Sequence, residues 1–193
     1  MEIWEKAHID VLDQEGPRAI ERIQALGYHA LGLTNGITGK IGDVSDMVEY
    51  RTEELYRLGY HFKSSIGQNG LRLGEEPLVG NGAPVYQDGI IYTSGLPKGP
   101  ILGVFLRSLS FSPKRIVFVD DKKGNLASVA AFCHQYGIEF LGIHFKAIDV
   151  KTQDQEWEER VSNCQFDYYE KFHQWLPDAE VRKSRCYIED RHM

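Results

Sequence analysis

The chain of 193 residues lacks several features that would place it in a well-known class of protein. It has no apolar run that approaches the roughly 20 residues required to span a membrane. Its 22 lysines and arginines are outnumbered by 28 acidic residues, which gives a net charge of −6. An acidic balance argues against broad electrostatic binding to nucleic acid or to an anionic membrane. We therefore expect neither as a partner.

Cysteine is also scarce. The three cysteines, Cys133, Cys164 and Cys186, are spaced too widely for a CxxC metal site, and their odd number favours reduced thiols. The first residues, 1–6, show no basic region followed by an apolar core, so no signal peptide is visible. These observations predict a cytoplasmic protein.

Short apolar strands alternate with helices along the first three quarters of the chain. This order predicts an α/β protein with a parallel sheet flanked by helices. A β-hairpin is expected where two apolar segments flank Gln87-Asp88-Gly89. The hydrophobic periodicity and the glycine and proline signals predict helices at 16–26, 43–58, 99–109 and 125–136, and strands at 29–34, 115–119 and 139–145.

The last part of the chain predicts one long amphipathic helix. Thr152 and Gln155 have the spacing of a capping box, and an apolar stripe follows from Trp157 to Trp175. Such a stripe is more typical of a docking face than of a cofactor site. We therefore divide the chain into a domain at 1–150 and a helical extension at 151–193 that packs on it.

Polar residues stand at the ends of two predicted strands. Thr34 ends one strand, and Asp120 and Asp121 end another. Ligands in parallel sheets bind at the carboxyl ends of the strands, so these residues are expected to face one crevice. Two adjacent carboxylates require compensation, and the residues alone leave three alternatives open: Mg²⁺, neutralisation by Lys122 and Lys123, or a helix-capping role for one aspartate.

Lys98 stands immediately before a predicted helix start, where a lysine can meet an anion. In this order, Thr34, Lys98 and the pair Asp120-Asp121 resemble motifs two, three and four of the haloacid dehalogenase (HAD) superfamily. The resemblance implies a Rossmann-like core in which Thr34 and Lys98 position a phosphoryl group. It also implies substrate contact by Asn35, which departs from the usual motif, and a weakly bound Mg²⁺ held by Asp120 and Asp121.

In more detail, the amino-acid sequence around these motifs is similar to one uncharacterised bacterial HAD-like family, a domain of unknown function placed near acid phosphatases. The similarity covers about residues 10–150 and is carried by the segments 31–34, 89–99, 116–121 and 142–145. The acidic pair is also similar to that of response-regulator receiver domains. Its late position in the chain argues against that interpretation.

The nucleophile of HAD enzymes is missing from the chain. These enzymes attack phosphate with an aspartate of an N-terminal DxDx(T/V) motif, and no DxD occurs before Thr34. Asp10 and Asp13 have the wrong spacing. The resemblance therefore implies a phosphohydrolase-type domain that is inactive alone, or a fragment of a phosphatase. The alternative is a non-catalytic module that binds phosphate and Mg²⁺. Either would take a phosphorylated small molecule.

A consequence for the sheet follows from the resemblance. In HAD domains the nucleophile strand is central and lies between the strands that carry motifs two and four. Without it, those two strands must pair directly, accept a substitute, or leave backbone groups unpaired. Residues 3–12 are the local candidate for a substitute. We expect an incompletely closed sheet that favours a homodimer.

Overall fold

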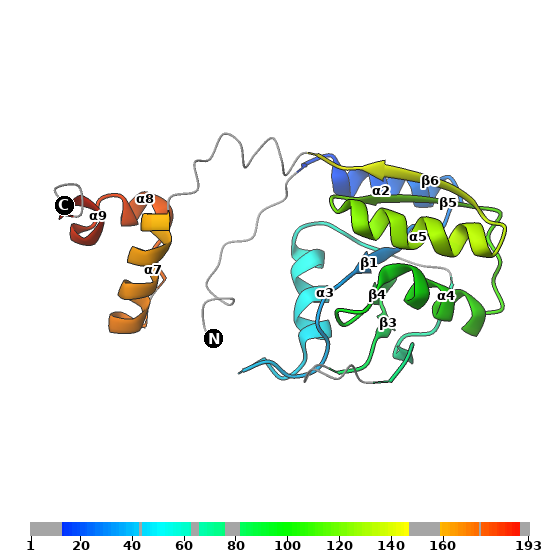
Figure 1. Cartoon of the computed structure of the whole chain (residues 1–193), viewed down its shortest axis with the longest axis horizontal. Helices are drawn as coiled ribbons and strands as arrows, with labels where there is room; N and C mark the ends of the chain where they lie inside the picture. The colour runs from blue at the N-terminus through cyan, green and yellow to red at the C-terminus, as the bar shows by residue number, and fades with distance from the viewer. Residues whose placement is uncertain are drawn as a thin grey trace. The chain divides into compact units, whose positions relative to one another are not determined.

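The computed structural model describes residues 13–42, 44–62, 66–75, 82–146, 159–173 and 175–189. The chain divides into two compact units (Figure 1): the larger spans Asp10–Ala147, and the smaller includes Ile148–Met193. The packing of the extension on the first domain stays a prediction. Among the described residues, no helix combines the length and the hydropathy needed to cross a membrane.

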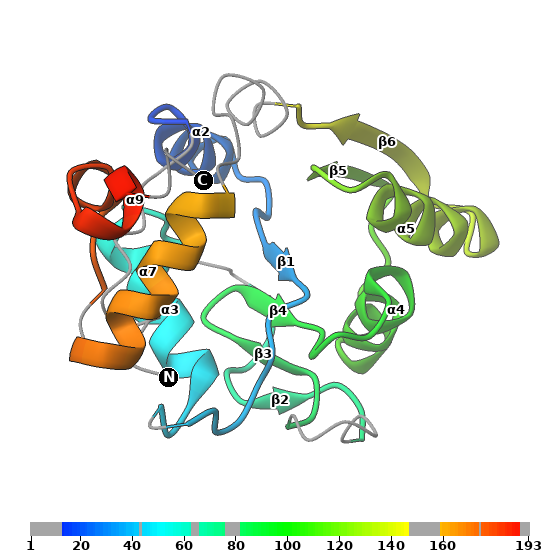
Figure 2. The ribbon, with the colours of Figure 1, turned by 60° about the vertical axis from the view of Figure 1, so that its left-hand side comes forward.

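The larger unit contains two separate sheets (Figure 2). One has four strands in the order β1-β4-β3-β2, in which β1 pairs with β4 in parallel and the other pairs are antiparallel. The other is the parallel pair β5-β6. The strands are β1 (Gly32–Thr34), β2 (Leu71–Arg72), β3 (Val85–Gln87), β4 (Ile90–Tyr92), β5 (Arg115–Asp120) and β6 (Glu139–His144).

The prediction of an α/β chain with a β-hairpin is therefore confirmed, but the parallel pairs β1-β4 and β5-β6 lie in two sheets rather than in one parallel sheet. The hairpin strand β4 pairs in parallel with β1, and β3 and β2 extend the same sheet by antiparallel pairing. Among the described residues, β1 and β5 do not pair with each other. The segment 3–12 lies outside the described residues, so its role as a substitute strand stays a prediction.

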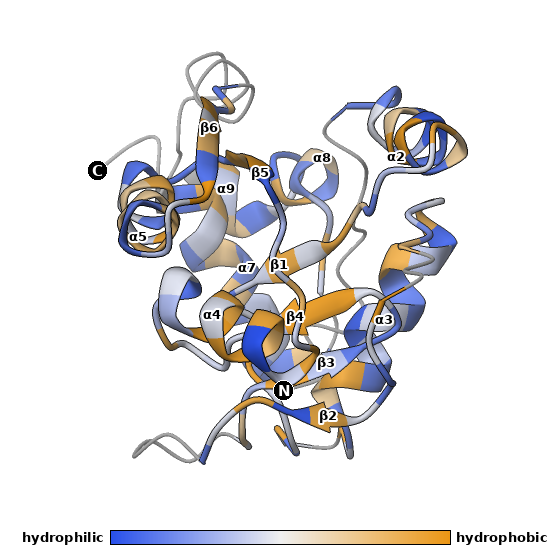
Figure 3. Ribbon diagram, turned by 90° about the vertical axis from the view of Figure 1, so that its right-hand side faces the viewer, coloured by the Kyte–Doolittle hydropathy of each residue, from blue (hydrophilic) through white to orange (hydrophobic). Residues whose placement is uncertain are grey.

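The turn between β3 and β4 follows the prediction of a hairpin. Asp88 and Gly89 have φ angles of 48° and 80°, and a tight hairpin turn requires such positive angles at both central residues. A Cβ atom on Gly89 would lie 1.8 Å from the carbonyl oxygen of Phe62, so only glycine fits. The turn holds β4 in the centre of its sheet, where Ile91 is fully buried and the strand is largely orange in Figure 3.

The helices of the larger unit lie close to their predicted positions. One difference is the late start of the second helix, which begins at Met47 because the Asp46 carboxylate accepts hydrogen bonds from the N–H groups of Val48 and Glu49. The helices are α2 (Gly16–Ala25), α3 (Met47–Arg57), α4 (Lys98–Ser108) and α5 (Lys123–Gln135).

One hydrophobic core connects the two sheets. Its fully buried centre includes Ile91 of β4, Phe105 of α4 and Val129 of α5. Partly buried side chains from both sheets pack against it, among them Leu31, Leu33, Ile116, Phe118 and Phe140. Strand β1 contacts α4 and strand β5 contacts α5, and the two helices pack against each other, so one core holds the strands that carry Thr34 and Asp120.

Within the larger unit, the described residues cover one face of the β5-β6 sheet. Val117, Val119, Leu141 and Ile143 project from the other face, and their exposed fractions are 55%, 52%, 53% and 42%. Parallel sheets are normally buried on both faces. We call these four residues the uncovered face.

The smaller unit contains the helices α7 (Glu159–Phe172), α8 (Asp178–Val181) and α9 (Arg185–Glu189). The predicted capping-box residues Thr152 and Gln155 lie outside the described residues, and the helix ends before Trp175. Part of the predicted stripe packs within this unit, where Val161 and Cys164 meet Val181 and Tyr187.

A disulfide joins Cys164 of α7 to Cys186 of α9. The prediction of reduced thiols is therefore wrong for these two cysteines, because helices far apart in sequence bring them together. Disulfides persist mainly in oxidising compartments, so the cysteine argument for a cytoplasmic location fails. Cys133 is free and buried, and burial raises the pKa of its thiol.

Candidate functional site

Hydrogen bonds to the backbone and to the side chain of Thr34 fix this residue at the end of β1. It stands opposite Tyr92 in the parallel ladder, and its carbonyl accepts a hydrogen bond from the N–H of Thr93 at 2.9 Å. Its Oγ1 accepts one from the N–H of Gly36 at 3.1 Å. The hydroxyl proton remains free to reach another acceptor.

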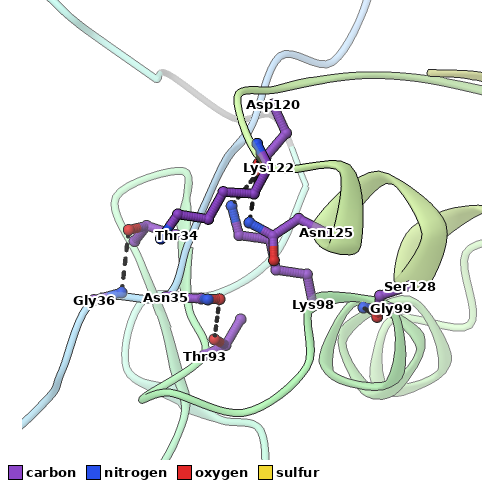
Figure 4. A network of polar contacts seen from close by, with 10 residues as sticks. All are labelled: Thr34, Asn35, Gly36, Thr93, Lys98, Gly99, Asp120, Lys122, Asn125 and Ser128. Carbon is purple, nitrogen blue, oxygen red and sulfur yellow. Dashed lines mark hydrogen bonds and ion pairs between the residues drawn. The ribbon is translucent and has the colours of Figure 1, made fainter. Parts of the chain in front are cut away.

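The next residue, Asn35, joins the loops that follow β1 and β4. Its Oδ1 accepts a hydrogen bond from the Thr93 hydroxyl at 3.1 Å (Figure 4). This bond gives Asn35 a structural role, because it holds the Thr34 loop against the chain segment that leads to Lys98. Substrate contact by Asn35 stays a prediction.

Lys98, the first residue of α4, forms a buried ion pair with Asp120, the last residue of β5. The Lys98 Nζ lies 2.6 Å from Asp120 Oδ2, and the two side chains are only 9% and 4% exposed. The ammonium group also lies 5.5 Å from the centre of the Phe118 ring, within the range of a cation–π contact. The pair links the start of α4 to the carboxyl end of β5.

Every oxygen of the Asp120 carboxylate is engaged. Oδ1 accepts hydrogen bonds from the N–H of Lys122 at 2.8 Å and from the Asn125 side chain at 2.9 Å. Burial by itself would raise the pKa of Asp120, but the bonds from Lys98, Lys122 and Asn125 outweigh it and hold this pKa below its usual value. Of the alternatives for the acidic pair, the structure has neutralisation of Asp120, by Lys98 rather than by Lys122 and Lys123, and α5 has no side-chain cap.

Acid should therefore weaken the fold through Asp120. Its folded-state pKa lies below the ordinary value of 3.8, so the unfolded chain binds the proton more readily. The stabilisation is complete above pH 3.8 and is lost as the pH falls through the folded-state pKa. Urea unfolding between about pH 5 and pH 2 should show a steeper loss for the native chain than for Asp120→Asn. Parallel curves would contradict this assignment.

Asp121 does not share the environment of its neighbour. Its side chain is exposed, and its backbone carbonyl lies 2.9 Å from His144 Nε2. The described residues contain no group of three His, Cys, Asp or Glu side chains that could hold a metal ion. Mg²⁺ would have to displace Lys98, or the hydrogen bonds from Lys122 and Asn125, from Asp120, so the residues present do not by themselves fit a magnesium site.

Figure 4 shows Thr34, Asn35, Lys98 and Asp120 in one region, as the sequence predicted for strand ends. We call Thr34, Lys98 and Asp120 the polar site. Lys122, whose side chain extends toward Thr34 in Figure 4, was expected only to neutralise the acidic pair.

Asn125 and Ser128 of α5 were not predicted. Asn125 binds Asp120, and Ser128 Oγ accepts a hydrogen bond from the N–H of Gly99 at 3.0 Å. A Cβ atom on Gly99 would lie 2.1 Å from the carbonyl oxygen of Ser128, so the close approach of α4 to α5 requires this glycine. The Gly99-Pro100 pair was a signal for a helix start, but nothing in the sequence identified its partner.

Asp13 is no part of the polar site. Its carboxylate accepts a hydrogen bond from the N–H of Glu15 at 3.0 Å, just before α2. It also lies close enough to Tyr60, beyond the C-terminal end of α3, to contribute to a raised pKa there, after burial as the main cause. Asp10, the other early aspartate, lies outside the described residues.

Comparisons with known proteins place the chain among uncharacterised relatives. A family model described as "Protein of unknown function (DUF2608)" matches residues 2–182. A Chlamydia pneumoniae protein named "Putative outer membrane protein" is 29% identical over 87 residues, which cover 45% of this chain and 32% of the relative. A Chlamydia trachomatis protein with the same name is 31% identical over 62 residues, covering 32% of this chain and 24% of the relative.

The matched part thus spans a third or less of the length of these relatives. No solved structure matches the chain.

Proposed function

We propose a phosphate-binding function for this chain, which belongs to the DUF2608 family of proteins of unknown function. In this proposal it is a HAD-like domain of the phosphohydrolase type, with a Rossmann-like core that lacks its central strand. The polar site recognises a phosphorylated small molecule, and the chain alone does not hydrolyse it. The observation that carries the proposal is the buried Lys98–Asp120 pair between the start of α4 and the end of β5.

Lys98 supports the proposal because its hydrogen-bonding capacity exceeds what Asp120 uses. An ammonium group has three N–H donors, and the described contacts include one hydrogen bond, to Asp120 at 2.6 Å. The remaining donors are available to an anion. A cation that is 9% exposed interacts with an anion more strongly than a solvated one does, because water screens it less.

Thr34 contributes in a different way. The bond from the N–H of Gly36 fixes the position of its oxygen, so the hydroxyl proton is the donor left for a ligand. Lys122 adds a second positive charge in the direction of Thr34. A hydroxyl, a buried ammonium group and an exposed ammonium group form a donor set suited to the oxygens of a phosphate.

Within the polar site, no described carboxylate is ready to attack phosphorus. Asp120 already accepts hydrogen bonds from Lys98, Lys122 and Asn125, and Asp13 lies elsewhere. Covalent phosphoryl transfer needs a nucleophile that is free of such contacts. The polar site can therefore bind phosphate and orient it without cleaving its ester bond.

We accordingly expect negligible hydrolysis of a small aryl phosphate by the purified chain, with or without millimolar Mg²⁺. Turnover should stay far below the roughly 1 per second at the lower end of ordinary enzymes. Release of the coloured phenol measures it directly, and Thr34→Val is the matched control for contaminating phosphatase. Turnover near 1 per second that Thr34→Val abolishes would reveal a nucleophile outside the described residues.

Weak binding of Mg²⁺ at Asp120 and Asp121 would have to compete with Lys98, because both oxygens of the Asp120 carboxylate are already engaged. The same competition applies to the alternative function, a non-catalytic module that binds phosphate and Mg²⁺. Calorimetry with Mg²⁺ tests the metal in both functions. Heat that Asp120→Ala removes supports the metal site, and equal heat from both chains contradicts it.

A further inference from the structure

A pocket of about 290 Å³ lies in the larger unit, where α4 and α5 end. The two helices pack side by side (Figure 2). The floor of the pocket is buried and apolar, and it is formed by Gly103 and Leu106 of α4, Phe132 of α5, and Ile138 just before β6. Ligand pockets in proteins share this apolar lining, and their volumes begin at about 300 Å³. The pocket therefore has the size for one small molecule.

The backbone at both helix ends shapes the pocket. After α4, Ser110 has a φ angle of 50°, and the N–H of Phe111 donates to a carbonyl of the last helical turn at 3.0 Å. After α5, Gly137 has a φ angle of 66°, and the N–H of Ile138 donates in the same way at 2.9 Å. A left-handed residue with such a bond ends a helix abruptly. The chain turns back at both places, which brings Phe111 and Ile138 into the pocket wall.

The rim of the pocket is rich in hydrogen-bond donors. Arg107 Nη1 donates to the Tyr136 hydroxyl at 3.2 Å, and the guanidinium group lies 5.9 Å from the centre of the Tyr136 ring. A guanidinium group has five N–H donors, and the described hydrogen bonds of Arg107 use one of them. Because the Tyr136 oxygen accepts this bond, its own proton is left as a donor. Ser110 and Ser112 add two exposed hydroxyl groups.

We propose that this pocket binds a small molecule with one aromatic ring and one carboxylate, the ring on Leu106 and Phe132 and the carboxylate on Arg107. A carboxylate only accepts hydrogen bonds, and the rim offers donors. The planar guanidinium group can meet both carboxylate oxygens with parallel N–H groups. An aromatic ring gains from the removal of its apolar surface from water and from contact with Phe132 and Tyr136.

A cationic ligand fits the pocket less well. The C-terminal end of a helix favours positive charge, but Arg107 already supplies that charge in the last turn of α4. The carbonyls of Leu106 and Arg107 are also occupied, by the N–H groups of Phe111 and Ser110. Among the described residues that line the pocket, Arg107 is the one charged side chain, so no carboxylate would compensate a second cation.

The pocket is separate from the polar site. Lys98 begins α4, and Arg107 stands nine positions further along, which is about 14 Å along a helix axis. None of the residues that line the pocket belongs to the polar site or to the uncovered face. The pocket would therefore bind its ligand whether or not the polar site binds phosphate.

Titration of the full chain with phenylacetate, followed by NMR of the backbone amides, tests the proposal. We expect saturable binding with a dissociation constant on the order of 1 mM, as is usual for so small a ligand, and the largest shift changes at Ser110, Phe111 and Ile138. Phenylacetamide lacks the charge and hexanoate lacks the ring, so each should bind about tenfold more weakly. Inorganic phosphate at the same concentration should not displace phenylacetate.

Protein variants locate the contact. Arg107→Gln removes the guanidinium group and should weaken the binding of phenylacetate about tenfold. Tyr136→Phe removes one hydroxyl only and should weaken it about threefold. Arg115→Gln is the matched control and should bind as the native chain does, because Arg115 is 62% exposed, pairs with Glu139 and does not line the pocket. Circular dichroism checks that all three variants fold.

Several results would overturn the proposal. One is the absence of saturable binding at phenylacetate concentrations on the order of 10 mM. Equal affinities for phenylacetate, phenylacetamide and hexanoate would exclude a site for an aromatic carboxylate, and so would tighter binding of phenethylamine. Unchanged affinity in Arg107→Gln would exclude the contact with the guanidinium group. Shift changes confined to Thr34 and Lys98, or displacement by inorganic phosphate, would assign the ligand to the polar site instead.

Discussion

Replacing Lys98 by methionine will lower the free energy of unfolding by about 3 kcal/mol. Methionine fills most of the same volume but leaves the Asp120 carboxylate, which is 4% exposed, without its cation. A buried charge that loses its partner retains the full cost of its removal from water. Urea denaturation of the native chain and of Lys98→Met, followed by circular dichroism at pH 7, measures the difference.

Two further variants show whether the pair itself is responsible. Lys122→Met alters an exposed lysine near the same carboxylate and should change the unfolding free energy by less than about 1 kcal/mol. Asp120→Asn combined with Lys98→Met removes both charges and should recover part of the loss. A Lys98→Met chain as stable as the native one would show that the ion pair does not stabilise the fold.

Loss of the disulfide should have a comparable effect on the smaller unit. The Cys164–Cys186 bond closes a loop with a sequence separation of 22, for which chain entropy predicts about 3 kcal/mol. The apolar core around it is small, so little else replaces this contribution. Thermal unfolding of Cys164→Ala/Cys186→Ala should show an earlier transition for this unit, and the reduced native chain should show the same shift.

Cys133 provides the internal control for that experiment. It is buried in the larger unit and is not part of the disulfide, so the reductant should leave the transition of that unit unchanged. A transition of the smaller unit that neither reduction nor the double variant moves would contradict a stabilising role for the disulfide.

Hydrophobic periodicity and turn signals were sufficient to predict most elements of the larger unit. The apolar run that precedes Asp120 predicted β5, and Asp88-Gly89 predicted the hairpin. The rule that ligands bind at the carboxyl ends of strands predicted that Thr34 and Asp120 would face one region. These features are local in sequence or follow from the direction of the strands.

Contacts between distant residues could not be predicted in the same way. Nothing near Lys98 in the sequence shows that it, rather than the adjacent Lys122, neutralises Asp120. The pairing of Cys164 with Cys186 depends on how the last helices turn back. The parallel contact of β4 with β1 likewise depends on tertiary packing, which the hairpin sequence does not record.

Phosphate binding by the polar site is the central prediction of the proposed function. Isothermal titration of the full chain with inorganic phosphate at pH 7 measures this, with Thr34→Val as the test variant. Thr52→Val is the matched control, because it loses a threonine hydroxyl that bonds to Tyr92 rather than facing the site. We expect binding with a dissociation constant on the order of 1 mM or tighter, retained by Thr52→Val and weakened about tenfold by Thr34→Val. Absent heat in the native chain, or equal heat in all three, would contradict the account.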